Sequence, residues 1–414
     1  MKHKMLLIFL LLISSGLYAQ INITGINRTR AEFLRGYKQL PSDTNTFAFQ
    51  VNQRTGMKFN YRNELIETNM TFLDARIWGA EFAKPSTNFL SVTEGYVRLF
   101  LPLNWSITAG RQLLSIDNER LIGKRDWNLK PTSHDALTIN YDSEKTKFQV
   151  ISAFNQSEYL YDGTNYKATG FYKVMNMLWF SYKFSYLTLA TMHVIDGFQS
   201  VNNANVIYIR YTPSVLFSYI TDTYKLNMRL FYQTGKSASG TNIDAYYAEA
   251  DFYSRFSKAA GFTIGTEIIS GEKMQSGNLI PSFNLLYGTV NRFNGNIDYF
   301  SNQNNSLAAG LINPFVKLDF KFGNRLTLNT DFHYFRIIDN TLYQFTEKEK
   351  TLGYETDLSL IYKPIETLNL KMGYSIFIPN SSMAFLTGGN SNYFGNYAYL
   401  MLTISPELFS NVKK

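Results

Sequence analysis

Residues 110–127 are the part of this chain best equipped for chemistry. The segment reads GRQLLSIDNERLIGKRDW, and no other stretch of the chain resembles it. Its cations and anions alternate: Arg111, Asp117, Glu119, Arg120, Lys124, Arg125 and Asp126. Side chains of opposite sign can pair with one another and still present charge to an ionic ligand. The segment is therefore a candidate ligand site, and its role depends on the elements that hold it.

Catalysis would require a nucleophile, a base and an orienting group that the fold can bring together. Beyond residue 20 the chain has three histidines, His134, His193 and His333, on three separate predicted strands. No Gly-x-Ser-x-Gly motif marks a nucleophilic serine, and no histidine pair has the spacing of a zinc site. His333 lies two residues from Asp331, which is also the ordinary spacing along one face of a strand. We expect no enzyme activity, no cofactor and no metal.

The first nineteen residues have the features of a secretory signal peptide. Lys2 and Lys4 form a basic start, residues 5–13 are apolar, and a small residue, Ala19, precedes Gln20. The apolar run is about half of the roughly 20 residues that a transmembrane helix needs. This pattern predicts a cleaved signal peptide over 1–19 and a single domain over 20–414.

The rest of the chain has the composition of a protein that enters a membrane with strands. Cysteine is absent, which excludes disulfides and thiolate metal sites. Hydrophobic residues make up 45% and aromatic residues 16% of the chain. No segment after the signal peptide is apolar for the length of a membrane helix.

Apolar and polar residues alternate with a period of two through most of the chain. The pattern is clear in 56–62, 226–232, 314–322 and 326–334, where one face carries aliphatic and aromatic residues and the other carries polar ones. A soluble β-sandwich also alternates in this way. Many strands of about ten residues after a signal peptide favour a transmembrane antiparallel β-barrel.

About eighteen strands are predicted. Their ranges are 21–35, 46–62, 65–80, 92–103, 105–114, 134–142, 146–155, 173–183, 185–195, 204–220, 224–235, 243–257, 261–270, 310–322, 326–337, 352–363, 367–378 and 395–404. The connections alternate between short turns and longer loops, and the longest runs from Gly271 to Ala309. Short periplasmic turns and long extracellular loops are typical of outer-membrane barrels.

Several ordered motifs resemble those of the alginate export family of outer-membrane barrels. They include LDARIWG at 73–79, EGYV at 94–97, GRQ at 110–112, DNERLIG at 117–123 and DW at 126–127. The segments 286–300 and 331–335 are similar to later parts of the same family. The chain departs from the family pattern at Asn291, where the family has histidine. The resemblance implies an eighteen-stranded channel that exports an alginate-like polysaccharide.

Carrying the alternation through each strand, with polar residues facing inward, gives a set of pore-lining candidates. The inward cations include Arg30, Arg54, Lys58, Arg76, Arg98, Arg210 and Arg229, and the inward anions include Asp74, Glu94, Glu249 and Asp331. The first eleven strands supply mostly cations and the later strands most of the anions. This distribution predicts a transverse field that favours anions. The alternative is that these charges pair across neighbouring strands and only hold the barrel in register.

The loops are predicted to close the lumen in part, because no separate plug domain is evident. The candidates are the segment 271–309 and the segment 115–131, with Arg120 and Arg125 expected to contact a solute. The alternation in the strand 105–114 predicts that the Arg111 side chain faces outward and the Gln112 side chain faces inward. Either a β-bulge turns Arg111 toward the lumen, or Arg111 lies at the rim of the barrel. The four tryptophans, Trp78, Trp105, Trp127 and Trp179, are expected at the membrane interfaces.

The predicted function is a porin-like channel in the outer membrane of a Gram-negative-type bacterium, for passive passage of anionic or hydroxyl-rich solutes. Its partners would be outer-membrane lipid and either a polysaccharide or a small anionic solute. The net charge of +8, or +6 without Lys2 and Lys4, is too dispersed for nucleic-acid binding. The alternatives are a non-conducting receptor or scaffold for a periplasmic or lipoprotein partner and, less favoured, a barrel hydrolase.

Overall fold

The computed structural model describes most of the chain. The described residues are 19–44, 46–80, 90–156, 159, 161, 171–200, 202–203, 205–275, 278–289, 291–300, 309–338, 346 and 349–411. Apart from Ala19, the predicted signal peptide lies outside these residues, so its assignment stays a prediction.

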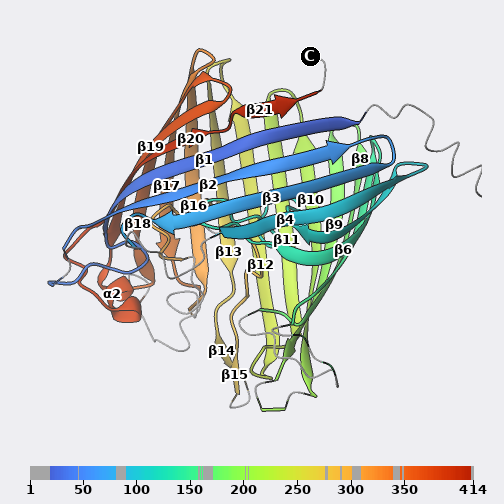
Figure 1. Cartoon of the computed structure of the whole chain (residues 1–414). Helices are drawn as coiled ribbons and strands as arrows, with labels where there is room; N and C mark the ends of the chain where they lie inside the picture. Colours follow the sequence, from blue (N-terminus) through green and yellow to red (C-terminus); the bar gives the residue numbers. More distant parts are fainter. Residues whose placement is uncertain are drawn as a thin grey trace, which may run out of the picture.

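Eighteen antiparallel strands form a closed barrel (Figure 1). The first nine are β1 (Gln20–Arg35), β2 (Ala48–Arg62), β3 (Ile66–Ile77), β4 (Leu90–Leu101), β5 (Trp105–Gln112), β6 (His134–Asp142), β7 (Thr146–Phe154), β8 (Val174–Phe184) and β9 (Leu187–Gln199). The next nine are β10 (Ile207–Ile220), β11 (Tyr224–Lys236), β12 (Asn242–Arg255), β13 (Ala260–Ile269), β16 (Leu311–Phe322), β17 (Leu326–Arg336), β18 (Thr351–Ile365), β19 (Leu368–Pro379) and β20 (Gly395–Ile404).

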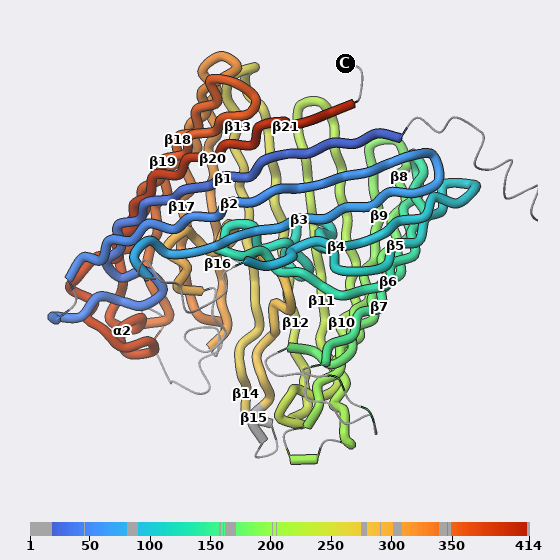
Figure 2. Tube along the Cα trace, in the orientation of Figure 1, coloured from blue at the N-terminus to red at the C-terminus, as the bar shows by residue number. Residues whose placement is uncertain are grey.

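Pairing of the first and last strands closes the barrel. β20 pairs with β1 from Asn27 opposite Ile404 to Arg35 opposite Asn396, and Figure 2 shows these two strands side by side. A short strand, β21 (Glu407–Ser410), continues this pairing along β1 beyond Pro406. Closure leaves no free sheet edge, which a lipid environment requires.

The predicted strands agree closely with the observed ones. All eighteen are present, and no boundary differs by more than four residues. Within the described residues, the structure adds β21, the short hairpin of β14 (Lys273–Gln275) and β15 (Asn278–Ile280), and one helix, α2 (Ser381–Thr387). These additions are too short to produce a clear periodic pattern. Within the described ranges, no helix is long and apolar enough to cross a membrane.

The two ends of the barrel differ in their connections. One end, here called the short-turn end, carries tight turns such as 63–65, 102–104, 143–145 and 323–325, together with the start of β1 and, in β21, the last strand (Figure 1). The other end carries α2, the β14–β15 hairpin and the long loops (Figure 2). This difference matches the prediction and places the short-turn end on the periplasmic side.

The outer surface is apolar and the lumen is polar near the short-turn end. Outward residues such as Val215, Leu230 and Ile264 are more than half exposed, as expected for a surface covered by lipid. Trp105 packs against Tyr141 and Phe148 on the outside, with ring centroids 5.1 and 6.1 Å apart, in the manner of an interfacial aromatic girdle.

The buried apolar core lies inside the barrel, toward the long-loop end. It combines inward residues of the strands with residues from two loops, including Leu114, Ile116, Leu121, Ile122, Phe283, Leu285, Tyr287, Ile297, Phe300, Phe335, Phe377 and Tyr397. The rule that inward positions are polar therefore fails at this level of the barrel, because side chains rather than water fill the interior.

Candidate functional site

Two loops fold into the lumen and contact each other there. The β5–β6 loop comprises residues 113–133, and the β13–β16 loop comprises residues 270–310. A parallel bridge joins Ile122 to Tyr287. The Tyr287 amide donates to the Leu121 carbonyl at 3.0 Å, and the Thr289 amide donates to the Glu119 carbonyl at 2.8 Å. The first segment and the described residues 283–289 and 291–300 of the second thus lie in the lumen as one connected structure.

Gly288 lies where the two loops come closest. A Cβ atom on Gly288 would lie 1.8 Å from the Arg120 carbonyl oxygen, which is far inside van der Waals contact. We expect Gly288→Ala to separate the loops and to increase the frequency of current fluctuations in planar bilayers. Gly323→Ala is a control in an open turn, because nothing lies within 4 Å of its Cβ position, although that turn has a positive φ. Identical current noise in wild type and Gly288→Ala would contradict the expected separation.

One side of the β5–β6 loop is held by three arginines of β1 and β2. Arg28 donates to the carbonyls of Asp126 at 2.6 Å and Asn128 at 2.7 Å. The Arg30 guanidinium donates to the Trp127 carbonyl at 2.9 Å and lies 4.2 Å from the centroid of the Trp127 ring. Arg54 forms an ion pair with the Asp126 carboxylate at 2.6 Å. These arginines therefore fix the loop to the wall.

The Asp126 carboxylate is ionised in this contact. Burial works against its charge, but the charge and hydrogen bond of Arg54, with Arg28, outweigh that effect and lower the pKa of Asp126. A lowered pKa means that the ion pair is intact at neutral pH. It is lost only in acid, as the pH falls below the usual aspartate value of about 4.

The other side of the β5–β6 loop is held by β11, β12 and β13. Asp117 pairs with Arg229 at 2.5 Å, and the Asn118 amide donates to Glu249 at 3.2 Å. Arg120 donates twice to the Glu267 carboxylate, at 2.6 and 2.7 Å. Because β1 and β2 lie in another part of the wall, the loop spans the lumen between two anchored sides.

The β13–β16 loop is anchored to the wall at three of its described residues, Asn284, Tyr287 and Ile297. The Tyr287 hydroxyl donates at 2.6 Å to Asp196, which also accepts from Arg210 at 3.0 and 2.5 Å. The backbone amide of Ile297 donates to the buried Glu355 carboxylate at 2.8 Å. Gln233 exchanges hydrogen bonds with the Asn284 backbone at 2.7 and 2.8 Å. These buried contacts make the loop a structural part of the lumen.

The prediction that Arg76 and Asp74 line the pore is wrong. The β2–β3 register places Asp74 opposite Thr55 and Arg76 opposite Gln53, whereas the lumen-facing Arg54 is opposite Ala75. Arg76 and Asp74 therefore face outward, where they bond each other at 2.7 and 2.5 Å. The buried inward residues of this part of β3 are Leu73 and Ala75. The interior is packed at this level, so the apolar residues face inward.

The remaining predicted strand residues do face the lumen. They are Arg30, Arg54, Lys58, Arg98, Arg210, Arg229, Glu94, Glu249 and Asp331. Many of them are paired, as the structural alternative proposed: Lys58 with Glu94 at 3.7 Å and Lys317 with Asp331 at 3.4 Å. Their contact with a solute stays a prediction.

The prediction that Arg120 contacts a solute is wrong, whereas contact of the partly exposed Arg125 with a solute stays a prediction. The Arg120 side chain is 0% exposed because it is paired with Glu267. Arg125 donates to the backbone carbonyls of Gly288 at 2.8 Å and Leu286 at 3.2 Å. Both side chains hold the loops in place. The charges of 110–127 pair mainly with the wall and with the other loop, not with one another.

Arg111 follows the alternation and faces outward. It donates to Asp135 at 2.8 and 2.7 Å, and Gln112 faces inward, where it donates to the Ala136 carbonyl at 2.8 Å. No β-bulge turns the Arg111 side chain inward, so the Arg111–Asp135 pair lies at the outer rim, where β6 begins.

Of the four tryptophans, Trp78 and Trp105 are outward and exposed. Trp127 lies under Arg30 in the lumen and Trp179 packs against the interior core, which corrects their predicted interfacial position.

Two cations on the exposed lumen surface were missing from the predicted set. Arg62 lies on the same face of β2 as Lys58, four residues away, so the period of two could have identified it. Arg292 belongs to the β13–β16 loop, donates to the Asn118 carbonyl and lies 3.7 Å from Glu119. No periodic pattern marks a loop residue of this kind.

The three histidines of the barrel each have a hydrogen-bond partner. In the described part of the chain, no three His, Asp or Glu side chains come together as a metal site. His134 bonds the Tyr172 hydroxyl at 2.7 Å, His193 bonds the Tyr211 hydroxyl at 2.7 Å on the outer face, and His333 bonds Asn313 at 3.0 Å. The three histidines belong to β6, β9 and β17, and each has a structural partner.

The barrel is similar to solved outer-membrane porins of the Occ/Opd group. It matches Pseudomonas aeruginosa OpdK with vanillate at a TM-score of 0.61 and 15% identity, over 94% of this chain and 100% of that one. It matches P. aeruginosa OccK2 (OpdF) in complex with glucuronate at 0.61 and 13%, over 94% and 98%. For Acinetobacter baumannii OccAB1 the values are 0.65 and 11%, over 94% and 97%.

These similarities establish the fold, an outer-membrane β-barrel of eighteen strands, at identities too low to transfer a solute. No protein-family model and no curated protein sequence matches the chain.

Proposed function

We propose that this protein is a porin-like outer-membrane channel for passive passage of small anionic, hydroxyl-rich solutes. The observation that carries the proposal is a group of lumen cations between the β5–β6 loop and the short-turn end. Lys58 and Arg62 of β2 and Arg98 of β4 share this part of the wall, with Lys58 44% and Arg98 34% exposed. Cationic side chains around a pore favour anions.

The loop-filled lumen favours a small solute over a polymer. The two loops are tied to the wall on several sides, so the remaining passage is narrower than that of an open eighteen-stranded barrel. Two similar porins were solved with the carboxylated solutes vanillate and glucuronate, which supports an anionic solute here. Export of an alginate-like polysaccharide, which the sequence resemblance implies, would require both loops to leave the lumen.

A non-conducting receptor or scaffold barrel is the second candidate. The observation that favours it is the buried core formed inside the barrel by Ile122, Tyr287, Phe300 and their neighbours. A core of this kind could block conduction completely. Conductance separates the two candidates, because a receptor barrel would carry no current.

Reversal potentials in planar bilayers under a KCl gradient test the channel. We expect an anion-selective wild-type pore and a shift toward cation selectivity in Lys58→Gln/Arg62→Gln/Arg98→Gln, because Glu94 and Glu67 remain without their cations. Arg76→Gln is the matched control, since it removes a charge from the outer face. A cation-selective wild type would contradict the proposal, and absence of current in every variant would favour the receptor.

A further inference from the structure

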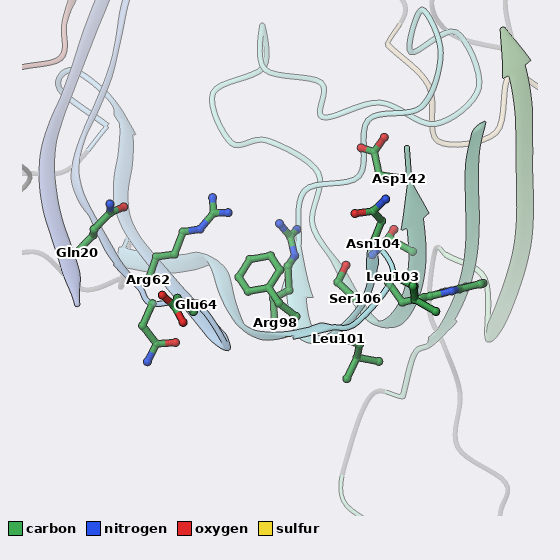
Figure 3. Close-up of a pocket in the computed structure, with 13 residues that line it drawn as sticks. Gln20, Arg62, Glu64, Arg98, Leu101, Leu103, Asn104, Ser106 and Asp142 are labelled. Atoms are coloured by element: carbon green, nitrogen blue, oxygen red, sulfur yellow. The ribbon is translucent and has the colours of Figure 1, made fainter. Parts of the chain in front are cut away.

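A large cavity opens inside the barrel at the short-turn end, apart from the loop contacts described above. Its volume is about 1020 Å³, and it lies between β2, β4, β5 and β6 (Figure 3). Its lining includes Arg62, Arg98, Phe100, Asn104, Ser106 and Asn140. Such a volume is at the upper end of the range of small-molecule sites, and it accommodates a solute larger than a single sugar ring.

Arg62 differs from most lumen arginines because its charge is not neutralised. Arg28, Arg54, Arg98 and Arg229 each have a carboxylate at 3.8 Å or closer. Over the described residues, Arg62 has no such partner, and its guanidinium lies 4.8 Å from the centroid of the Phe100 ring. Stacking on an aromatic face orients the planar guanidinium and leaves its edge donors free. That geometry suits a carboxylate.

The rest of the cavity supplies neutral hydrogen-bonding groups and a second cation. Arg98 is held in place by Thr108 at 3.0 Å and Glu67 at 3.2 Å. In Figure 3 the side chains of Arg62 and Arg98 lie to one side, with Ser106 between them and Asn104. Amides and hydroxyls of this kind bind solute hydroxyl groups, whereas a wall of hydrophobic residues would not.

The carboxylates at the edge of the cavity limit the charge of the solute. Glu64 and Asp142 also line it, and within the described residues the Asp142 carboxylate has one distant ionic partner, Lys147 at 3.9 Å. A solute with one carboxylate would place it at Arg62 and keep its hydroxyls toward Asn104 and Asn140. A solute with several carboxylates would place a further negative charge close to the Asp142 carboxylate, and repulsion between like charges would disfavour its binding.

We propose that this cavity is a periplasmic-side binding site for monocarboxylated, hydroxyl-rich solutes of the sugar-acid class. The inference rests on the proposed channel function and deepens it. Arg62 stacked on Phe100 binds the carboxylate, and the amide and hydroxyl groups across the cavity bind the solute hydroxyls. A solute therefore has a defined resting position between the loop-narrowed part of the lumen and the periplasm.

Single-channel recording with glucuronate as the probe tests this site. Glucuronate is added to one side of the bilayer at a time, and the duration of current blockades is measured for wild type, Arg62→Gln and Arg62→Lys. Loss of a charge-assisted bidentate contact should make the solute dissociate faster. We therefore expect Arg62→Gln to shorten the blockades from one side roughly tenfold. Arg62→Lys should recover only part of this, because lysine cannot form the bidentate contact.

Two controls separate this site from charge in general and from the channel itself. Lys321→Gln removes a cation from the same face of β16 as Lys317, outside the cavity, and should leave blockade durations unchanged. Glucose, which lacks a carboxylate, should give no blockades that depend on Arg62. Equal durations in wild type and Arg62→Gln, in a pore that remains anion-selective, would overturn the site alone. A cation-selective wild type would overturn the proposed channel function, and the blockade durations would still decide the site.

Discussion

Replacing Arg120 with alanine is expected to weaken the fold and open the lumen more than any other single substitution. Arg120 is fully buried and its partner Glu267 is 3% exposed, with two bonds of 2.6 and 2.7 Å between them. The Tyr247 hydroxyl also donates to Glu267 at 2.6 Å, and the Phe293 ring lies 4.6 Å from the guanidinium. Removing the cation leaves a buried, uncompensated carboxylate, which costs about 3–5 kcal/mol.

The measurement pairs urea unfolding, followed by tryptophan fluorescence, with current through single channels. Arg120→Ala should lower the free energy of unfolding and raise the conductance and its noise, since the β5–β6 loop loses a central anchor. Arg111→Ala is the matched control: its bidentate pair with Asp135 has the same geometry, but the side chains are 45% and 52% exposed. Such an exposed pair contributes about 1 kcal/mol or less.

A double substitution separates the loss of the anchor from the penalty of the orphaned charge. Arg120→Ala/Glu267→Gln removes the buried carboxylate as well, so its unfolding free energy should lie between those of wild type and Arg120→Ala. Its conductance should stay high, because the loop is still without its anchor. Equal stability of Arg120→Ala and Arg111→Ala would contradict a structural role for Arg120.

The strands could be predicted because their pattern is local. In 226–232 and 326–334, each side chain's environment follows from its parity within one strand. The lengths of the connections are also local features. Because short and long connections alternate along the chain, the sequence predicts which connections share each end of the barrel without knowledge of the strand pairing. Pairing between neighbours then follows from chain order in an up-and-down barrel.

The site was harder to predict because its contacts join distant parts of the chain. Arg120 and Glu267 are 147 residues apart, and Arg28 and Asp126 are 98 apart. Sequence alone gave the charged residues of 110–127 but not the partners that bury them. The same long-range packing fills the interior beside β3, which is why the polar-inward rule assigned Asp74 and Arg76 to the wrong face.

Replacing the β5–β6 loop with a short turn is expected to increase single-channel conductance severalfold. Gln112 and His134 are paired neighbours at the ends of β5 and β6, so a four-residue Gly-Ser turn can replace residues 113–133 without straining the barrel. The deletion removes the span between the β1–β2 wall and the β11–β13 wall. An eighteen-stranded barrel without that obstruction encloses an aqueous channel.

Deleting the β5–β6 loop should also loosen the β13–β16 loop. The conductance should therefore rise more than it would if only the β5–β6 loop had left the lumen. The β13–β16 loop would lose two backbone acceptors, the Leu121 carbonyl for the Tyr287 amide and the Glu119 carbonyl for the Thr289 amide. It would also lose the Arg125 guanidinium, which donates to two carbonyls of the β13–β16 loop. Asp117→Asn/Asp126→Asn, which weakens two anchors but keeps the loop, should give an intermediate conductance. Unchanged conductance in the deletion, with a barrel still resistant to SDS before heating, would mean that the current does not pass this loop.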